Sequence, residues 1–427
     1  MNRSRGRLIL FLLLVAVAPH TLLGAGPPLP AGPEIRVNRG IAGGYGDPQV
    51  AVFRDGGFVV VWTVGPSGII TAACGFPTSA PSFLHARLFH PDGSPASREL
   101  QLVRPFGRQA ADSVAALADD SFVVVYEQFD DRGRSIVLAA RFARDGTRLV
   151  PPVRVHAASG LSRYCGQVAA DPGNGGFAVA WTGFTFDGPG DTFGHSNAYA
   201  RRFTAEGVPL GPEILMAQGF SQGGGADVQT GAVAVAGDGS LFVAVTSFGD
   251  GISSSVARTD AMGRPVGGID LHQLSPQTDA TLSMAPDGTL AVVWIDVPSC
   301  GGFNSPSHVW ALRLGADGNP LDTDPLRVNR RGICERQPKV AALAGGGFVA
   351  LWTDGAGRDG SGAGVFGRTF GADGAPETRD FRVNVTTEGD QTLSAIAANA
   401  RGDIVAVWVQ ANSPAQIVAR RFSPPGS

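Results

Sequence analysis

The stretch RDGGFVVVWT, residues 54–63, places a tight polar turn directly before an unbroken apolar run that ends in Trp62. Asp-Gly is typical of such turns, because glycine adopts backbone conformations that other residues avoid. The run has no polar alternate positions, so both faces of the strand it predicts must be buried. Nearly the same phrase returns as AGGGFVALWT at residues 344–353, which indicates an internal repeat.

Seven copies of this turn and apolar strand can be followed along the chain. They recur at a spacing of roughly 50 to 65 residues, a period typical of propeller blades. All but the fourth end in an aromatic residue. The apolar strands are predicted at residues 58–62, 122–126, 177–181, 241–245, 290–294, 348–352 and 404–408.

Each unit contains three further predicted strands. A shorter strand precedes the turn, as in KVAAL at 339–343. A strand carrying Arg follows a connection of variable length, as in HARLF at 85–89 and VARRF at 418–422. A short alternating strand such as FRVN at 381–384 comes last. Four strands per repeat at this period predict a β-propeller.

The burial pattern separates a propeller from a β-sandwich. Each propeller blade lies between two neighbours, so its middle strands are buried on both faces, as FVVVW at 58–62 requires. A sandwich would instead show apolar and polar residues alternating along most strands. We therefore predict an all-β, seven-bladed β-propeller of four-stranded blades.

The two ends of the repeat region predict how the ring closes. The last unit stops after VARRF and lacks its fourth strand, whereas EIRVN at residues 34–38 is a fourth-type strand with no unit before it. We predict that EIRVN completes blade 7. This pairing would join the chain ends and cover a sheet edge that otherwise invites aggregation.

Residues 1–25 are predicted to be a secretory signal peptide. Three arginines precede the apolar run at residues 8–18, and small residues follow it. The run is shorter than the about 20 residues needed to span a bilayer. We expect residues 26–33 to be a linker, residues 34–427 to form a single domain, and the product to be secreted or held at the cell surface.

Composition narrows the range of partners. The chain has 427 residues and a net charge of -3, and no Lys/Arg cluster follows the signal region. Nucleic acid and anionic membranes are therefore not expected as partners. No membrane span is predicted, and we expect a monomer.

The segment at residues 345–391 resembles the uncharacterised tandem repeats of exported bacterial surface proteins, which often lie beside adhesin-like or haemolysin-type calcium-binding modules. The resemblance covers nearly the whole mature chain. It departs in the fourth unit, where the strand aromatic is missing and the third strand reads VARTD. It implies an exported surface or matrix role and contributes no catalytic residues.

The longest predicted connections lie on one face of the propeller, at residues 64–84, 182–197, 295–308 and 353–364. Function is expected there, because loops on a rigid scaffold usually carry it. Exposed aromatic side chains are frequent anchors for partners. The candidate binding residues in or beside these connections are Phe76, Phe83, Phe184, Phe303 and Trp310.

A second set of aromatics closes the apolar strands themselves. Trp62, Trp352 and their equivalents share one buried repeat position. Packing between blades explains them better than a ring of sugar-binding side chains.

The four cysteines map to the same loop-bearing face. Disulfides persist in exported proteins. Cys300 lies in the long connection of the fifth unit and Cys334 at the entry to the sixth, so we expect this pair to form a disulfide. Cys74 and Cys165 are separated by the second unit and form the second predicted pair, with free thiols as the alternative for both. The spacing does not resemble a zinc site.

Aspartate and glycine recur in the long connections. Asp187, Asp191, Asp354 and Asp359 are the candidate metal ligands, since calcium binds carboxylate and carbonyl oxygens. The ordered DxDxDG loop is absent, and ordinary tight turns also prefer Asp-Gly. Calcium is one interpretation and turn formation is the other; no other cofactor is predicted.

No catalytic motif is recognisable: HExxH, GxSxG and the sialidase-type aspartate box are all missing. Carboxylates from different blades could still assemble a glycosidase pair. We predict an exported, non-catalytic binding or surface-scaffold propeller that recognises a protein or glycan. The alternatives are a polysaccharide-acting hydrolase or lyase and a structural spacer at the cell surface.

Overall fold

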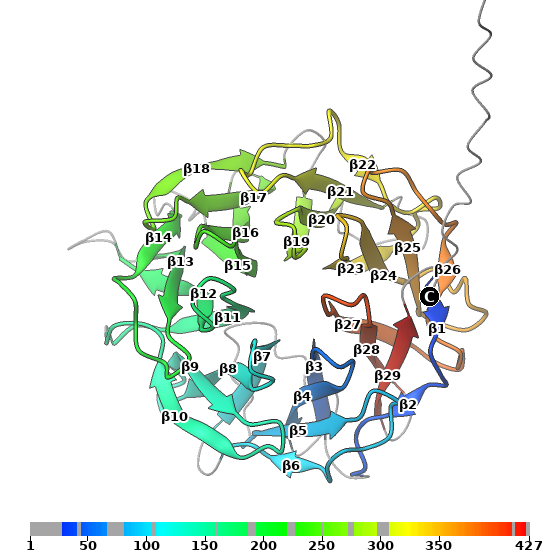
Figure 1. The fold of residues 1–427 in the computed structure, drawn as a ribbon, viewed down its shortest axis with the longest axis horizontal. Helices are drawn as coiled ribbons and strands as arrows, with labels where there is room; N and C mark the ends of the chain where they lie inside the picture. The colour runs from blue at the N-terminus through cyan, green and yellow to red at the C-terminus, as the bar shows by residue number, and fades with distance from the viewer. Residues whose placement is uncertain are drawn as a thin grey trace, which may run out of the picture.

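The computed structural model describes residues 28–40, 44–65, 81–103, 108–158, 160–186, 194–219, 227–249, 251–271, 277–296, 307–411 and 415–423. Seven antiparallel sheets stand in a ring around a central axis (Figure 1). Six sheets have four strands, and the one that contains both ends of the described chain has five. The predicted seven-bladed β-propeller is confirmed.

The strands run outward from the axis in chain order, and we number the blades 1 to 7 along the chain. The inner strands are β3 (Gly44–Val52), β7 (Arg108–Ala116), β11 (Arg163–Ala170), β15 (Asp227–Val235), β19 (Gln277–Met284), β23 (Glu335–Ala342) and β27 (Gln391–Ala398). The second strands are β4 (Phe58–Gly65), β8 (Phe122–Phe129), β12 (Phe177–Thr185), β16 (Leu241–Phe248), β20 (Leu290–Asp296), β24 (Phe348–Asp354) and β28 (Ile404–Gln410).

The third strands are β5 (Phe83–Phe89), β9 (Ser135–Phe142), β13 (His195–Phe203), β17 (Ile252–Thr259), β21 (His308–Leu314), β25 (Gly364–Phe370) and β29 (Gln416–Ser423). The outer strands of blades 1 to 6 are β6 (Leu100–Gln101), β10 (Arg148–Arg154), β14 (Ile214–Ala217), β18 (Pro265–Asp270), β22 (Leu326–Arg327) and β26 (Phe381–Arg382). Described residues include no helix that could cross a membrane.

Blade 7 is closed by the N-terminal part of the chain, as predicted. Strand β2 (Ile35–Arg36) pairs antiparallel with β29, placing Ile35 opposite Ala419. A second short strand, β1 (Leu29–Pro30), also pairs with β29 and lies opposite its end. The expected linker therefore contributes a strand of its own, which the sequence pattern did not indicate.

The last residue of the EIRVN segment shows why it fits there. Asn38 Oδ1 accepts a hydrogen bond from the Ile417 backbone N–H at 2.8 Å. Equivalent asparagines in blades 5 and 6 do the same: Asn329 accepts from Val309 and Asn384 from Val365, each at 2.9 Å. The fourth strand thus carries its own docking residue, whichever end of the chain supplies it.

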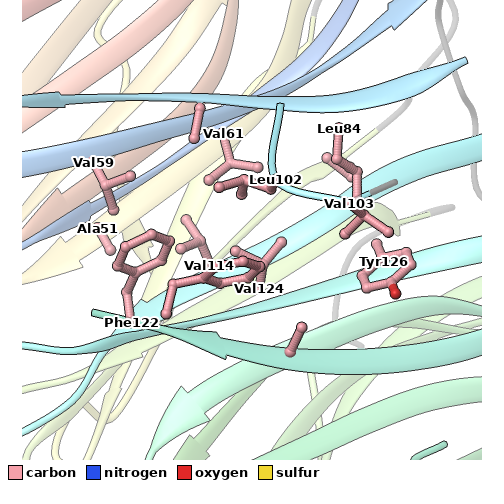
Figure 2. Packing of buried hydrophobic residues seen from close by; sticks show 14 of the residues in the cluster. Ala51, Val59, Val61, Leu84, Leu102, Val103, Val114, Phe122, Val124 and Tyr126 are labelled. Atoms are coloured by element: carbon pink, nitrogen blue, oxygen red, sulfur yellow. The ribbon is translucent and has the colours of Figure 1, made fainter. Parts of the chain in front are cut away.

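The core lies between neighbouring blades. The closing aromatics of the second strands are buried: Trp62, Tyr126, Trp181, Trp294, Trp352 and Trp408. Figure 2 shows one such interface, where Val59 and Val61 of blade 1 pack towards Phe122 and Val124 of blade 2. The interpretation of these aromatics as packing residues is confirmed.

The recurring arginines of the third strands also have structural roles. The guanidinium of Arg87 lies 5.3 Å from the centre of the Phe89 ring, and Arg368 lies 5.4 Å from that of Phe370. Arg87 Nη1 also donates to the Val37 carbonyl at 2.8 Å. Arg368 Nη1 likewise donates to the Val328 carbonyl of blade 5 at 2.9 Å, so both arginines link a third strand to the preceding blade.

Candidate functional site around the axis

Antiparallel pairing places two sets of connections on one face of the ring: those between second and third strands, and those that lead into the next inner strand. We call this the loop face. The opposite face, which we call the turn face, carries the hairpins between first and second strands. The inner strands begin at the loop face, so their first residues surround the axis there.

Every inner strand has a β-bulge near its start. The register shift lies between Gly46 and Gln49 in β3 and recurs at the equivalent point in the other six inner strands. Bulge residues Asp47, Cys165, Asp279 and Gln337 have positive φ angles of 39°, 55°, 57° and 51°. Bulges redirect side chains and are common beside functional sites. Here they form a ring around the axis.

The preceding blade fixes most of these bulges with a hydrogen bond. The acceptor is the residue that directly follows the buried aromatic of the second strand, and the donor is a bulge N–H of the next blade. The pairs are Thr63 with Ala111 at 2.9 Å, Glu127 with Cys165 at 2.9 Å, Thr182 with Thr230 at 3.0 Å, and Thr353 with Leu393 at 3.0 Å.

Blade 5 cannot supply this bond, because Ile295 occupies the acceptor position. Instead, the Asp279 carboxylate accepts a hydrogen bond from the Gln337 backbone N–H. Asp279 is accessible to solvent, yet burial raises its pKa. Both observations fit a side chain that projects into a narrow, wet channel, where it keeps some water but loses bulk hydration.

A cavity of about 660 Å³ follows the axis between the inner strands. About half of the residues that line it are alanine or valine. A polar ring lies near the bulges, with Gly231 in place of a side chain in blade 4; its members are Gln49, Ser113, Gln167, Thr281, Lys339 and Ser394. Arg54 and Asp171 line the end nearer the turn face.

A buried acidic cluster lies at the loop face of blade 6. Glu335 starts β23 opposite Asp354 at the end of β24, and both side chains are fully buried. Arg358 Nη1 lies 3.3 Å from Asp354 Oδ2 and 3.9 Å from Glu335 Oε1. Arg358 Nη2 lies 3.2 Å from Asp380 Oδ2. One guanidinium therefore faces three carboxyl groups.

This surplus of carboxyl groups favours protonation of Glu335. Burial, together with the negative charge of Asp354, raises the pKa of Glu335 to about 8. Burial also raises the pKa of Asp354. Asn329 Nδ2 donates to Glu335 Oε1 at 3.2 Å, whereas Oε2 has no partner among the described residues. At neutral pH, Glu335 is therefore mostly neutral.

The predicted metal ligands Asp354 and Asp359 both stabilise the loop that follows β24. Asp354 Oδ1 accepts from the Ala356 N–H at 3.1 Å, and Asp359 Oδ2 accepts from Asn384 Nδ2 at 2.8 Å. Asp187 and Asp191 lie outside the described residues. Within the described ranges, no group of three or more His, Cys, Asp or Glu side chains is arranged to hold a metal ion. Calcium binding stays a prediction.

Of the predicted aromatic anchors, Phe83, Phe184 and Trp310 are described, and they lie in blades 1, 3 and 5. These blades are not neighbours, so the fold does not bring the three together. Phe184 packs edge-on against Phe186, whose surface is 45% exposed. Trp310 Nε1 donates to Asp296 Oδ2 at 2.9 Å. Phe76 and Phe303 lie outside the described residues.

Two of the four cysteines can be placed. Cys165 is a buried bulge residue at the axis, and Gln229 Nε2 lies 3.5 Å from its sulfur. Cys334 directly precedes Glu335. Cys74 and Cys300 lie outside the described residues, so both pairings stay predictions.

Sequence reasoning missed several residues that the fold places at the axis or loop face. They are Asp279, Glu335, Lys339, Arg358 and Asp380. Two of these had a readable signal. Lys339 is the only lysine in the chain, and Glu335 occupies a repeat position where Gln109, Gln277 and Gln391 stand in other blades.

Comparisons with known proteins give no family: no protein-family profile and no curated protein matches the chain. A protein of unknown function from Dyadobacter fermentans is similar in structure, with 11% identity, a TM-score of 0.54, and coverage of 93% of this chain and 99% of its own. An α-L-arabinanase from Penicillium chrysogenum has 12% identity and a TM-score of 0.49, covering 72% of this chain and 91% of its own. At these identities, the first similarity supports the propeller fold alone, and the second carries no argument about activity.

Proposed function

We propose that the chain is an exported propeller that binds a protein or glycan partner through its loop face. The supporting observation is the difference between the two faces. Turn-face hairpins are uniformly short, as at residues 53–57 and 343–347. Connections between second and third strands on the loop face range from residues 249–251 in blade 4 to residues 66–82 in blade 1. Variable loops on a constant frame are typical of binding scaffolds.

The hydrogen bonding of the loop face supports a preorganised surface. Described carboxylates there already accept backbone N–H groups: Glu127 from Cys165, Asp112 from Gly166 at 3.0 Å, and Asp354 from Ala356. The first two bonds fix the bulge of β11 beside the axis, and the third fixes the start of the connection that follows β24. A fixed surface loses less conformational entropy when a partner binds.

Export is part of the proposal and rests on residues 1–25. Their basic, apolar and small-residue order is that of a cleavable signal. The resemblance to repeats of exported bacterial surface proteins supports the same location. N-terminal sequencing of protein recovered outside the cytoplasm should begin near residue 26, whereas an intact N-terminus on cytoplasmic protein would contradict export.

Export also supports the two predicted disulfides. Peptide mapping of unreduced protein should recover Cys300 linked to Cys334, and Cys74 linked to Cys165. Recovery of alkylated free thiols at either pair would show that pairing to be wrong.

Binding should be tested with the mature chain against a glycan array and, separately, against extracellular proteins of the source. Phe186→Ser alters an exposed aromatic of the loop face and should weaken binding severalfold. Met262→Ser is the matched control, because Met262 is 82% exposed on a turn at the opposite face. Equal loss in both variants would contradict loop-face recognition, and no binding of either class would favour the structural spacer.

A second candidate is a polysaccharide-acting hydrolase or lyase. The observation in its favour is that acidic residues Asp47, Asp112 and Asp279 occupy bulges around the axis. Incubation with a panel of polysaccharides tests it by product release. Turnover that Asp279→Asn abolishes would replace the binding proposal with the enzymatic one.

A further inference from the structure

We propose that the axial channel is itself a binding site for a small carboxylate with an apolar body, and that Lys339 binds the carboxylate group. The site differs from the loop-face site in both position and ligand size. It would stand if the loop-face proposal failed.

Lys339 is unusual both as a residue type in this chain and in its position beside the channel. The chain has 34 lysine and arginine residues, and Lys339 is the only lysine among them. It follows the bulge of β23, is partly buried and lines the channel. None of the ion pairs found between described residues includes it. A partly buried lysine that forms no ion pair with a described carboxylate can pair with an anionic ligand.

The other charges of the channel leave this cation available. Asp171 lies near the turn face, and its buried carboxylate is paired with Arg202 at 2.7 Å. Asp279 interacts electrostatically with Lys339 without an ion-pair contact, and its carboxylate also accepts the Gln337 N–H. Arg54, at the turn-face end, adds a second positive charge. Among the residues that line the cavity, Arg54 and Lys339 are cationic and Asp171 is anionic.

The wall defines the rest of the ligand. About half of the residues that line the cavity are alanine or valine, among them Ala51, Val114, Val168 and Val233. Its volume of about 660 Å³ falls within the usual range for small-ligand pockets. Such a wall favours an apolar body, and the polar ring beside Lys339 can donate to a carboxylate. The single positive charge of Lys339 matches the single negative charge of a monocarboxylate.

Binding can be measured by ligand-observed NMR and calorimetry on the mature chain. The probe is 3-phenylpropionate, and 3-phenylpropanamide is its neutral counterpart of the same shape. We expect the acid to bind at least about tenfold more tightly than the amide, as the loss of a charge-assisted hydrogen bond implies. Equal affinities, or no binding of the acid, would overturn the proposal.

Variants separate the charge of Lys339 from its shape. Lys339→Met keeps an apolar stem and should weaken acid binding about tenfold, whereas Lys339→Arg should retain most of it. Asp279→Asn should strengthen binding, because it removes a repulsive carboxylate while its amide oxygen can still accept the Gln337 N–H. Arg148→Gln, an exposed charge change on the outer strand of blade 2, is the control. Unchanged affinity in a folded Lys339→Met protein would overturn the assignment.

The single lysine also permits a chemical test without any variant. Acetic anhydride can modify only Lys339 and the N-terminal amine among the protein's amines, and peptide mass spectrometry distinguishes the two. The acid should slow acetylation of Lys339 severalfold and leave the N-terminal amine unaffected. Equal rates at Lys339 with and without the acid would place the ligand elsewhere and overturn the proposal.

Discussion

Glu335 occupies a position that three other blades fill with glutamine. In blade 7, Gln391 Oε1 accepts from Asn384 Nδ2 at 2.9 Å, and Gln391 Nε2 donates to the Glu388 carbonyl at 3.0 Å. Protonated Glu335 has the same shape and also accepts from an asparagine. Protonated Glu335 therefore replaces the glutamine of the other blades at neutral pH. When Glu335 ionises, blade 6 buries a negative charge where those blades have a neutral amide.

Glu335→Gln tests this interpretation. The pKa of Glu335 is raised from about 4.5 to about 8 by folding, so its contribution to stability is full below pH 4.5 and is lost as the pH rises to 8. The variant should match the wild type near pH 4.5 and exceed its free energy of unfolding by a few kcal/mol at pH 8. Denaturant unfolding across this pH range measures the difference.

The control for that experiment is Glu388→Gln. Glu388 is an exposed carboxylate in the connection before β27. Its substitution should leave the pH dependence unchanged. A parallel stability curve for Glu335→Gln and wild type would contradict a raised pKa at Glu335.

At the scale of the strand, a hydrogen bond between neighbouring blades positions the inner strands around the axis. It joins the second strand of one blade to the bulge in the inner strand of the next. The residue after the buried aromatic accepts it, as Thr63 does from Ala111. This hydrogen bond explains why Thr follows Trp in three units. The sequence showed the apolar strand but gave no sign of the role of the threonine.

Thr63→Val should leave the Ala111 N–H without its acceptor in a buried position. The expected cost is about 1–3 kcal/mol of unfolding free energy, the usual penalty for an orphaned buried donor. Thr63→Ser keeps the hydroxyl and should recover most of that loss. Denaturant titration measures both variants: equal losses would show that the lost hydrogen bond does not account for the destabilisation.

The sequence could predict the strands, their order and the closing segment, because each depends on a pattern within one repeat. It could not predict the bulges, since the one extra residue between Gly46 and Gln49 leaves the apolar pattern of the strand intact. Nor could it bring Glu335, Arg358 and Asp380 together, because their contact depends on how a connection folds back on its blade. The predicted anchors Phe83, Phe184 and Trp310 lie in blades 1, 3 and 5, as their places in the first, third and fifth repeats imply.

At the scale of the whole molecule, the ring depends on two short strands from the N-terminal region. β2 supplies the outer strand of blade 7, and Asn38 reproduces the bond made by Asn329 and Asn384. β1 adds a second, shorter contact with the end of β29.

Removal of residues 26–38 should expose the edge of β29, lower Tm and promote self-association through that edge. Removal of residues 26–31 alone deletes β1 and should have a smaller effect. Thermal unfolding and light scattering after size-exclusion chromatography measure both. If the longer truncation stayed monomeric with an unchanged Tm, the closing role of β2 would be disproved.

The closure also determines when blade 7 can form during synthesis of the chain. Asn38 and Ile417 are 379 positions apart, so β2, one of the first strands to leave the ribosome, must wait for β29, the last, before it can pair. Until then the ring stays open, and earlier blades have no final partner on one side. A circular permutant with new ends in the hairpin at residues 236–240 would let β2 and β29 emerge together. Blade 7 should therefore form without that delay, whereas the pairing of β15 with β16 in blade 4 becomes the last step that closes the ring.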